Sequence, residues 1–320
     1  MESDILSPEF TDPDKAREVL EAERWPDGPV CPHCGVIGEA YKLEAVEGTK
    51  THARKGVYKC ADCRKQFTVT VDTIFEDSHI PLNKWLFAIH LLCASKKGMS
   101  AHQLHRMLGV TYKSAWFMAH RIRYGMKQEP LSSKLQGTFE VDETWIGGKR
   151  KTGRQPQHGG DPNANRNPRA NKAPVVALLQ RGGKVQSFHV ERVTSENLRP
   201  IVKDIVAHGS HVITDSGTAL KFTRDEYRHD TVNHTRGEYV RREGETVIST
   251  NAVEGYFGIL KRGINGVYHH VGKHHLHRYL SEFDFRYNAR EVSDKQRAKL
   301  ALKGVSGKRL MYRDSCAKTA

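Results

Sequence analysis

Residues 138–146, TFEVDETWI, contain the most informative charge in this chain. Their β-branched and aromatic residues predict a strand, yet Asp142 lies in the middle of it. A charge inside an apolar strand is costly unless it is paired or bound to a metal ion. Asp142 is therefore a candidate metal ligand, and the alternative is an ordinary paired acid at the surface.

The segments after this strand predict an ordered series of elements. We expect strands at 173–180, 185–190, 211–214 and 231–235, and helices at about 195–207, 218–227, 249–262 and 274–302. A strand, two more strands, a helix, a strand, a helix, a short strand and a helix follow one another in the ribonuclease-H-like layout. The predicted fold class is therefore α/β, with a mixed five-stranded sheet and flanking helices.

Two further carboxylates stand where this layout would bring them to Asp142. Asp215 follows the apolar strand 211–214, and ligand sites in α/β sheets lie at strand ends. Glu254 lies in the helix that begins at 249–251, with Asn251 and Lys261 on the same helix face. Clustered carboxylates repel one another and suit Mg²⁺, commonly as a pair of ions about 4 Å apart. Taken singly, each acid could equally be a paired surface acid, a helix cap or a solvated residue.

Four of the six cysteines form two C-x-x-C pairs, Cys31/Cys34 and Cys60/Cys63. Two such turns can complete a tetrahedral site of four thiolates, which zinc prefers. Because no position stays open for water, the predicted zinc ion is structural and belongs to a zinc ribbon at residues 31–80. The alternatives are a redox dithiol and ordinary buried cysteines.

Residues 81–130 have the pattern of a helix-turn-helix unit. Three helices are expected, the second after Ser100 and the third after Thr111, both good N-cap residues. The third helix carries Lys113, Arg121 and Arg123, which we expect to contact DNA. A plain three-helix packing unit is the alternative.

The charge distribution favours a polyanionic partner. The chain of 320 residues has a net charge of +14, and its sequence pI is about 9.5. Residues 1–30, an expected acidic helix, are negatively charged, so the excess lies in the remainder. A mobile basic loop is expected at 147–173, including Lys149, Arg150, Lys151 and Arg154. Nucleic acid is the usual partner of such an excess, although a basic surface kept for solubility is the alternative.

The composition also excludes several classes. The mean hydropathy is −0.63, and no apolar run is long enough for a transmembrane helix. The first residues have no secretory pattern, and six cysteines are too few for a disulfide scaffold. We therefore expect a protein of a reducing cytosol.

Together these motifs resemble bacterial insertion-sequence transposases of the DDE type that carry an N-terminal zinc ribbon. The resemblance spans about residues 10–312 and is carried by RWPDGPVCPHCG (24–35), YKCADCRKQFTVTVDTIFEDSHIPLNKW (58–85), VDETWIGGKRK (141–151), ITDSG (213–217), TNAVEGYFGILKRGINGVYHHVGKHHLHRYLSEFDFRYNAR (250–290) and GKRL (307–310).

The resemblance implies the catalytic residues. Asp142 and Asp215 match the first two metal-binding acids, Glu254 the third, and Lys261 the basic residue that follows it. Some relatives use Asn in the third position, which keeps Asn251 as an alternative. Water would free a 3′-OH at the element's end, and that 3′-OH would then attack target DNA, with two Mg²⁺ or Mn²⁺ ions bound. Arg262 and the basic loop would contact the DNA backbone.

The expected organisation is an acidic helix (1–30), the ribbon (31–80), the helix-turn-helix unit (81–130), the catalytic domain (135–290) and a C-terminal tail (291–320). Its partners would be transposon ends and target DNA, with at least a dimer in the active complex. Two other functions remain open. One is a DNA-binding regulator without catalysis, and the other is a repair or resolving nuclease of the same fold.

Overall fold

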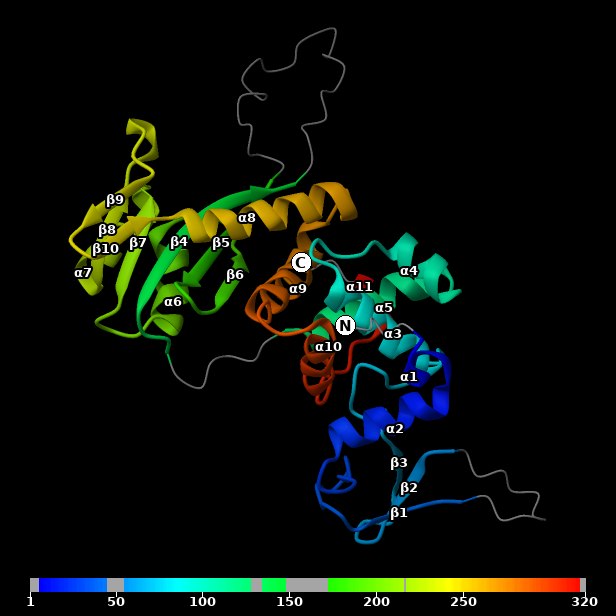
Figure 1. Ribbon diagram of the computed structural model, residues 1–320. Helices are drawn as coiled ribbons and strands as arrows, with labels where there is room; N and C mark the ends of the chain where they lie inside the picture. Colours follow the sequence, from blue (N-terminus) through cyan, green and yellow to red (C-terminus); the bar gives the residue numbers. More distant parts are fainter. Residues whose placement is uncertain (1–5, 45–54, 128–133, 148–171, 216, 317–320) are drawn as a thin grey trace, which may run out of the picture. The chain divides into compact units, whose positions relative to one another are not determined.

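The computed structural model describes residues 6–44, 55–127, 134–147, 172–215 and 217–316 (Figure 1). The chain forms two compact units. The first combines residues 1–127 with 291–320, and the second comprises 128–290. The second unit is therefore an insertion between two parts of the first.

The first unit joins a small sheet to a group of helices. Its antiparallel sheet has the order β1-β2-β3, and helix α3 packs against α2 and α10. Its elements are α1 (Pro8–Thr11), α2 (Pro13–Arg24), β1 (Ala40–Lys42), β2 (Val57–Cys60), β3 (Gln66–Thr68), α3 (Leu82–Ala94), α4 (Ala101–Leu108), α5 (Tyr112–Gly125), α10 (Asp294–Lys303) and α11 (Tyr312–Cys316).

Helices α4 and α5 form the expected helix-turn-helix. The Ser100 hydroxyl accepts the Gln103 N–H at 3.2 Å, and the Thr111 hydroxyl accepts the Ser114 N–H at 3.1 Å. Gly109 ends α4 in the left-handed conformation, with φ of 59°. Both predicted N-caps are confirmed, and the short turn keeps the two helices in contact.

The C-terminal segment differs from the expected separate tail. Arg297 of α10 is buried and donates to the Cys93 carbonyl at 3.1 Å, and the buried Lys308 donates to the Lys127 carbonyl at 2.7 Å. Arg121 of α5 in turn donates to the Leu310 carbonyl at 3.0 Å. These buried contacts make the described part of 291–320 a component of the first unit.

The second unit is built on a five-stranded sheet of order β6-β5-β4-β7-β8. Strand β4 pairs antiparallel with β5 and parallel with β7, β5 pairs antiparallel with β6, and β7 pairs parallel with β8. This is the ribonuclease-H-like arrangement, so the predicted fold class is confirmed. The elements are β4 (Thr138–Ile146), β5 (Ala173–Gln180), β6 (Val185–His189), α6 (Ser195–Ile205), β7 (His211–Asp215), α7 (Thr223–Glu226), β8 (Arg228–Val232), β9 (Val240–Glu243), β10 (Thr246–Ser249), α8 (Asn251–Gly263) and α9 (Leu276–Asn288).

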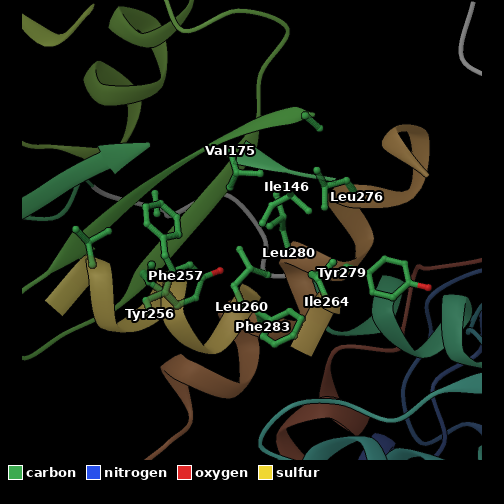
Figure 2. Close-up of a cluster of buried hydrophobic side chains, with 14 of the residues drawn as sticks. Ile146, Val175, Tyr256, Phe257, Leu260, Ile264, Leu276, Tyr279, Leu280 and Phe283 are labelled. Atoms are coloured by element: carbon green, nitrogen blue, oxygen red, sulfur yellow. The ribbon is translucent and has the colours of Figure 1, made fainter. Parts of the chain in front are cut away.

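Helices cover both faces of this sheet. Helix α6 packs on Phe139 and Val141 of β4, whereas α8 and α9 pack on the other face (Figure 1). Figure 2 shows the core on the face covered by α8 and α9, in which Tyr256, Phe257 and Leu260 of α8 contact residues of α9 and of the strands. Their spacing of one and four residues is that of a helix face turned toward a core.

Three local features depart from the sequence expectations. Residues 240–249 form an antiparallel hairpin, β9–β10, that the sequence analysis did not predict. The helix expected at 218–227 is reduced to a 3-10 turn (Thr218–Leu220) and α7, and that expected at 274–302 is divided into α9 and α10. Ser293 starts α10 anew with a capping box. Among the described residues, no helix has the length and apolar character that a membrane span needs.

Candidate metal centres

The first candidate centre lies in the first unit, around its three-stranded sheet, where the four predicted cysteines converge. Their sulfur atoms all lie within 4.8 Å of one another. The Sγ–Sγ distance is 3.6 Å both for Cys31 and Cys63 and for Cys34 and Cys60. A tetrahedron with zinc–sulfur bonds of about 2.3 Å has sulfur–sulfur edges of about 3.8 Å, so the four thiols fit a zinc ion.

The backbone prepares one of these sulfurs, that of Cys31, for ionisation, whereas burial and hydrogen bonds among the thiols raise the pKa of Cys34 to about 12 and raise that of Cys63. Burial alone would raise the pKa of the Cys31 thiol, but the N–H groups of His33 and Cys34 donate to its sulfur and lower the pKa to about 6. A thiol with a lowered pKa supplies thiolate at neutral pH, and the thiolate is the metal ligand. Loop geometry and charge therefore both suit a structural metal site.

The second candidate centre lies on the sheet of the second unit. Strands β4 and β7 pair in parallel, with Val141 opposite Thr214, so Asp142 and Asp215 follow side by side. Val141 and Val212 pack toward α6. Alternation along the strands therefore turns Asp142 and Asp215 toward the other sheet face.

Glu143 joins these two aspartates. One carboxylate oxygen from each of Asp142, Glu143 and Asp215 lies within 4.8 Å of the others. The Asp142 Oδ1 accepts the Glu143 N–H at 2.8 Å, and the Asp215 Oδ1 accepts the Gly217 N–H at 2.9 Å. A Cβ at position 217 would lie 2.8 Å from the Asp215 Oδ1, so a larger residue there would displace the Asp215 carboxylate.

The electrostatics of this group favour a cation. The pKa of Asp142 is raised to about 6, chiefly by burial and in part by the charges of Asp215 and Glu254, against the opposing effect of the Glu143 N–H. A divalent cation would offset both effects, because it replaces lost hydration and neutralises mutual repulsion. The oxygen donors present therefore fit Mg²⁺ or Mn²⁺.

Glu254 lies beside this group and is held by other residues. It occupies the first turn of α8, and its Oε1 accepts the Thr250 hydroxyl at 3.0 Å. The same oxygen lies 3.2 Å from the His234 Nε2, which also lies 3.1 Å from the Thr250 hydroxyl. Within the described residues, the oxygens that cluster most closely are thus those of Asp142, Glu143 and Asp215, with Glu254 as a neighbouring charge.

The other residues predicted on α8 line its solvent side. Asn251, Lys261 and Arg262 are exposed, and the Arg262 Nε donates to the Gly258 carbonyl at 3.0 Å. Lys261 follows Glu254 by two helical turns, about 10 Å along the axis. Lys261 and Glu254 therefore share one side of α8.

The predicted DNA-contacting residues of α5 divide into two groups. Lys113 is exposed, with its Nζ 4.5 Å from the centre of the Tyr312 ring. Arg121 and Arg123 are instead buried, with 5% and 2% of their surfaces exposed. The Arg121 guanidinium donates to the carbonyls of Glu76 and Leu310. The predicted DNA contact is therefore wrong for both arginines, because the first unit encloses them.

Four basic residues of the predicted set, Lys149, Arg150, Lys151 and Arg154, lie outside the described residues. The histidine-rich segment 268–277 is described, but it does not form a metal-binding group. Across the part of the chain that the structure describes, the groups that could hold a metal ion are the four cysteines and the three carboxylates above.

Sequence reasoning missed four residues around the carboxylates: Glu140, Glu143, His234 and Thr250. Glu140 carried the same signal as Asp142, a charge within an apolar strand, and the two share a strand face. For His234 and Thr250 the sequence offered no such signal, because the contact depends on how the segment after β8 returns to α8.

A cluster of carboxylates on a ribonuclease-H-like sheet, with a four-cysteine ribbon in the same chain, is typical of nuclease-type enzymes that move DNA segments. Comparisons with known proteins are consistent with this class. Residues 134–288 match the ISXO2-like transposase domain, and residues 11–66 match the transposase zinc-ribbon domain. The chain therefore belongs to the insertion-sequence transposases of the DDE type that carry an N-terminal zinc ribbon.

Two known proteins also match this chain individually. The chain is 27% identical over 303 residues to an uncharacterized protein in transposable element ISH50 of Halobacterium salinarum, covering 92% of this chain and 96% of that protein. A pre-cleavage Mos1 transpososome structure has 10% sequence identity and a TM-score of 0.17, covering 62% of this chain and 75% of that one. A TM-score this low carries no argument, so the fold assignment depends on the sheet order.

Proposed function

We propose that this transposase binds the inverted-repeat ends of its element, cleaves a DNA strand there and joins the new end to target DNA. The proposal depends chiefly on the neighbouring positions of Asp142 and Asp215 at one end of paired strands. Asp142, Asp215 and Glu254 would hold divalent cations, with Asn251 as a less favoured third ligand. When bound, Mg²⁺ or Mn²⁺ supplies charge stabilisation for phosphodiester cleavage.

The proposed reaction has two steps, hydrolysis and strand transfer. In the first, a water oxygen bonds to the phosphorus at the element's end, the bond from phosphorus to the 3′ oxygen breaks, and a 3′-OH is released. In the second, that 3′-OH attacks a target phosphodiester and displaces the target's own 3′ oxygen. Lys261 would hold a nearby phosphate by charge, and no covalent enzyme intermediate is required.

The ribbon and the helix-turn-helix unit would recognise the DNA ends. Helix α5 would enter the major groove with its first turn, where Lys113 is exposed, while Arg262 and the basic loop contact phosphates. The active complex would pair two ends and so contain at least two copies of the chain. Thiolate ligands for zinc suit a reducing cytosol, where we expect the protein to act.

The test uses the full chain and DNA flanking its gene, after imperfect inverted repeats bounded by short direct repeats have been located. Mn²⁺-dependent nicking at the repeat and a joined product are expected. Asp142→Ala should abolish both without weakening DNA binding, and Asp204→Ala, which removes an exposed acid of α6, should leave both unchanged.

Other outcomes would contradict parts of this proposal. DNA binding without cleavage under any divalent cation would favour a regulator. Cleavage without a joined product would favour a repair or resolving nuclease. Activity retained by Asp142→Ala would show that these carboxylates are not the catalytic ones.

A further inference from the structure

Helix α8 has an unusual N-terminus. Its N-cap residue, Thr250, is buried, and its hydroxyl accepts no backbone N–H of the helix. The two N–H groups that an N-cap side chain normally satisfies belong here to Ala252 and Val253. Both donate to the Oε2 of Glu140, at 2.8 and 3.0 Å. A residue of β4, more than 100 positions earlier, therefore caps α8.

Contacts on both carboxylate oxygens hold Glu140 in this position. It is 1% exposed, and its second oxygen, Oε1, accepts the Arg181 Nε at 2.7 Å. Other N–H groups of Arg181 donate to the carbonyls of Val247 and Ser249 and to the Ser249 hydroxyl. One ion pair, between the buried Glu140 and the partly exposed Arg181, thus connects β4, the turn after β5, strand β10 and the start of α8. Because both carboxylate oxygens are occupied, Glu140 is not a metal ligand.

The cap from β4 leaves the Thr250 hydroxyl available for another role. That hydroxyl donates to the Glu254 Oε1 at 3.0 Å, and His234 contacts the same oxygen. Glu140 and Asp142 lie two residues apart on one strand face. Fixing the first turn of α8 to Glu140 therefore also fixes Glu254, which lies in that turn, relative to Asp142.

We propose that Glu140 is the positioning residue of the third carboxylate, with Arg181 as its counter-ion. It holds the first turn of α8 on β4, so that Thr250 orients Glu254 toward Asp142 and Asp215. This inference depends on the proposed function of Glu254 as a metal ligand. It goes beyond that proposal by assigning a role to a buried acid that touches neither DNA nor metal.

The test is a double-mutant cycle between Glu140 and Glu254 in the full chain. The readout is Mn²⁺ affinity without DNA, from the electron paramagnetic resonance signal of free Mn²⁺. Glu140→Ala is expected to weaken Mn²⁺ binding about 10-fold, the size typical of removing an outer partner of a ligand. In the Glu254→Ala background the same substitution should have no further effect, because the residue it positions is absent.

A second variant covers the case in which Glu140→Ala does not fold. Glu140→Gln has the same shape and keeps an acceptor for the α8 N–H groups, so its Mn²⁺ affinity should lie between those of the wild type and Glu254→Ala. With end-containing DNA, the loss should appear in kcat rather than in the KM for DNA. Thr194→Ala is the matched control, because it removes the ordinary N-cap of α6 in the same unit and should leave Mn²⁺ affinity unchanged.

The outcomes separate this inference from the proposed function. If Glu254→Ala weakens Mn²⁺ binding but the Glu140 variants bind normally, or if the two effects add, Glu140 is only a structural ion pair. If Glu254→Ala changes neither Mn²⁺ affinity nor cleavage, the role of Glu254 itself is wrong.

Discussion

Replacing Asp142 by Asn should stabilise the metal-free protein and at the same time remove its capacity to bind a divalent cation. Burial, followed by the charges of Asp215 and Glu254, raises the pKa of Asp142 from 3.8 to about 6. A difference of about 2 pKa units corresponds to about 3 kcal/mol. Because part of the side chain is solvent-accessible, we expect a gain of about 2–3 kcal/mol in the free energy of unfolding at pH 8. The amide keeps an acceptor for the Glu143 N–H.

The effect has a defined pH dependence. Since the pKa of Asp142 is raised in the folded state, the folded protein binds more protons than the unfolded chain between about pH 3.8 and pH 6. Deprotonation through this window therefore lowers the stability of the wild type, and the loss is complete above it. The advantage of Asp142→Asn should shrink from about 2–3 kcal/mol at pH 8 to about half of that at pH 5.

The assay must report on the second unit alone. Hydrogen exchange of β5 peptides, measured across a urea series, gives the free energy of unfolding of this sheet. Mn²⁺ should stabilise the wild type and leave Asp142→Asn unchanged. Asp204→Asn, an exposed acid of α6, is the control and should show no gain. A variant no more stable than the wild type at pH 8, or a gain that does not shrink at pH 5, would refute the reasoning.

Three further predictions concern other sites. Cys60→Ser should abolish the single bound zinc ion and unfold the ribbon, whereas Cys93→Ser, outside the four-cysteine group, should keep one zinc per chain by elemental analysis. Arg121→Met should lower the free energy of unfolding of the first unit by about 2–3 kcal/mol in urea unfolding. Lys113→Ala should leave that stability unchanged, but it should weaken binding to the DNA ends and reduce the salt dependence of binding by about one counterion. Tyr256→Phe removes a 2.5 Å hydrogen bond to the partly buried Asp284 carboxylate of α9, whose pKa is raised by desolvation to about 7. Calorimetry should therefore show a destabilisation of about 1–3 kcal/mol that is larger at pH 9 than at pH 6.

The parts of the molecule that follow from local pattern were predictable. The strand around Asp142 could be recognised because its β-branched and aromatic residues surround acidic residues that need a partner when buried. The ribbon followed from two cysteine pairs, and the caps Ser100 and Thr111 from residue type. In each case the physical cause acts within a few residues of the signal.

The arginines of α5 and the glutamate of β4 show why the remainder was not predictable. Arg121 was expected to contact DNA because it is a basic residue on the third helix of a helix-turn-helix pattern, whereas in the structure it donates to the carbonyl of Leu310, 189 residues later. Glu140 carries the same local signal as Asp142, and only a helix start 112 residues away makes Glu140 a cap, while Asp142 lies in the carboxylate cluster with Glu143 and Asp215. A charged residue in an apolar strand thus predicts that a partner exists. Which residue is the partner depends on which distant segment packs against it in the fold. For this reason the double-mutant cycle between Glu140 and Glu254 tests a relation that composition and spacing do not contain.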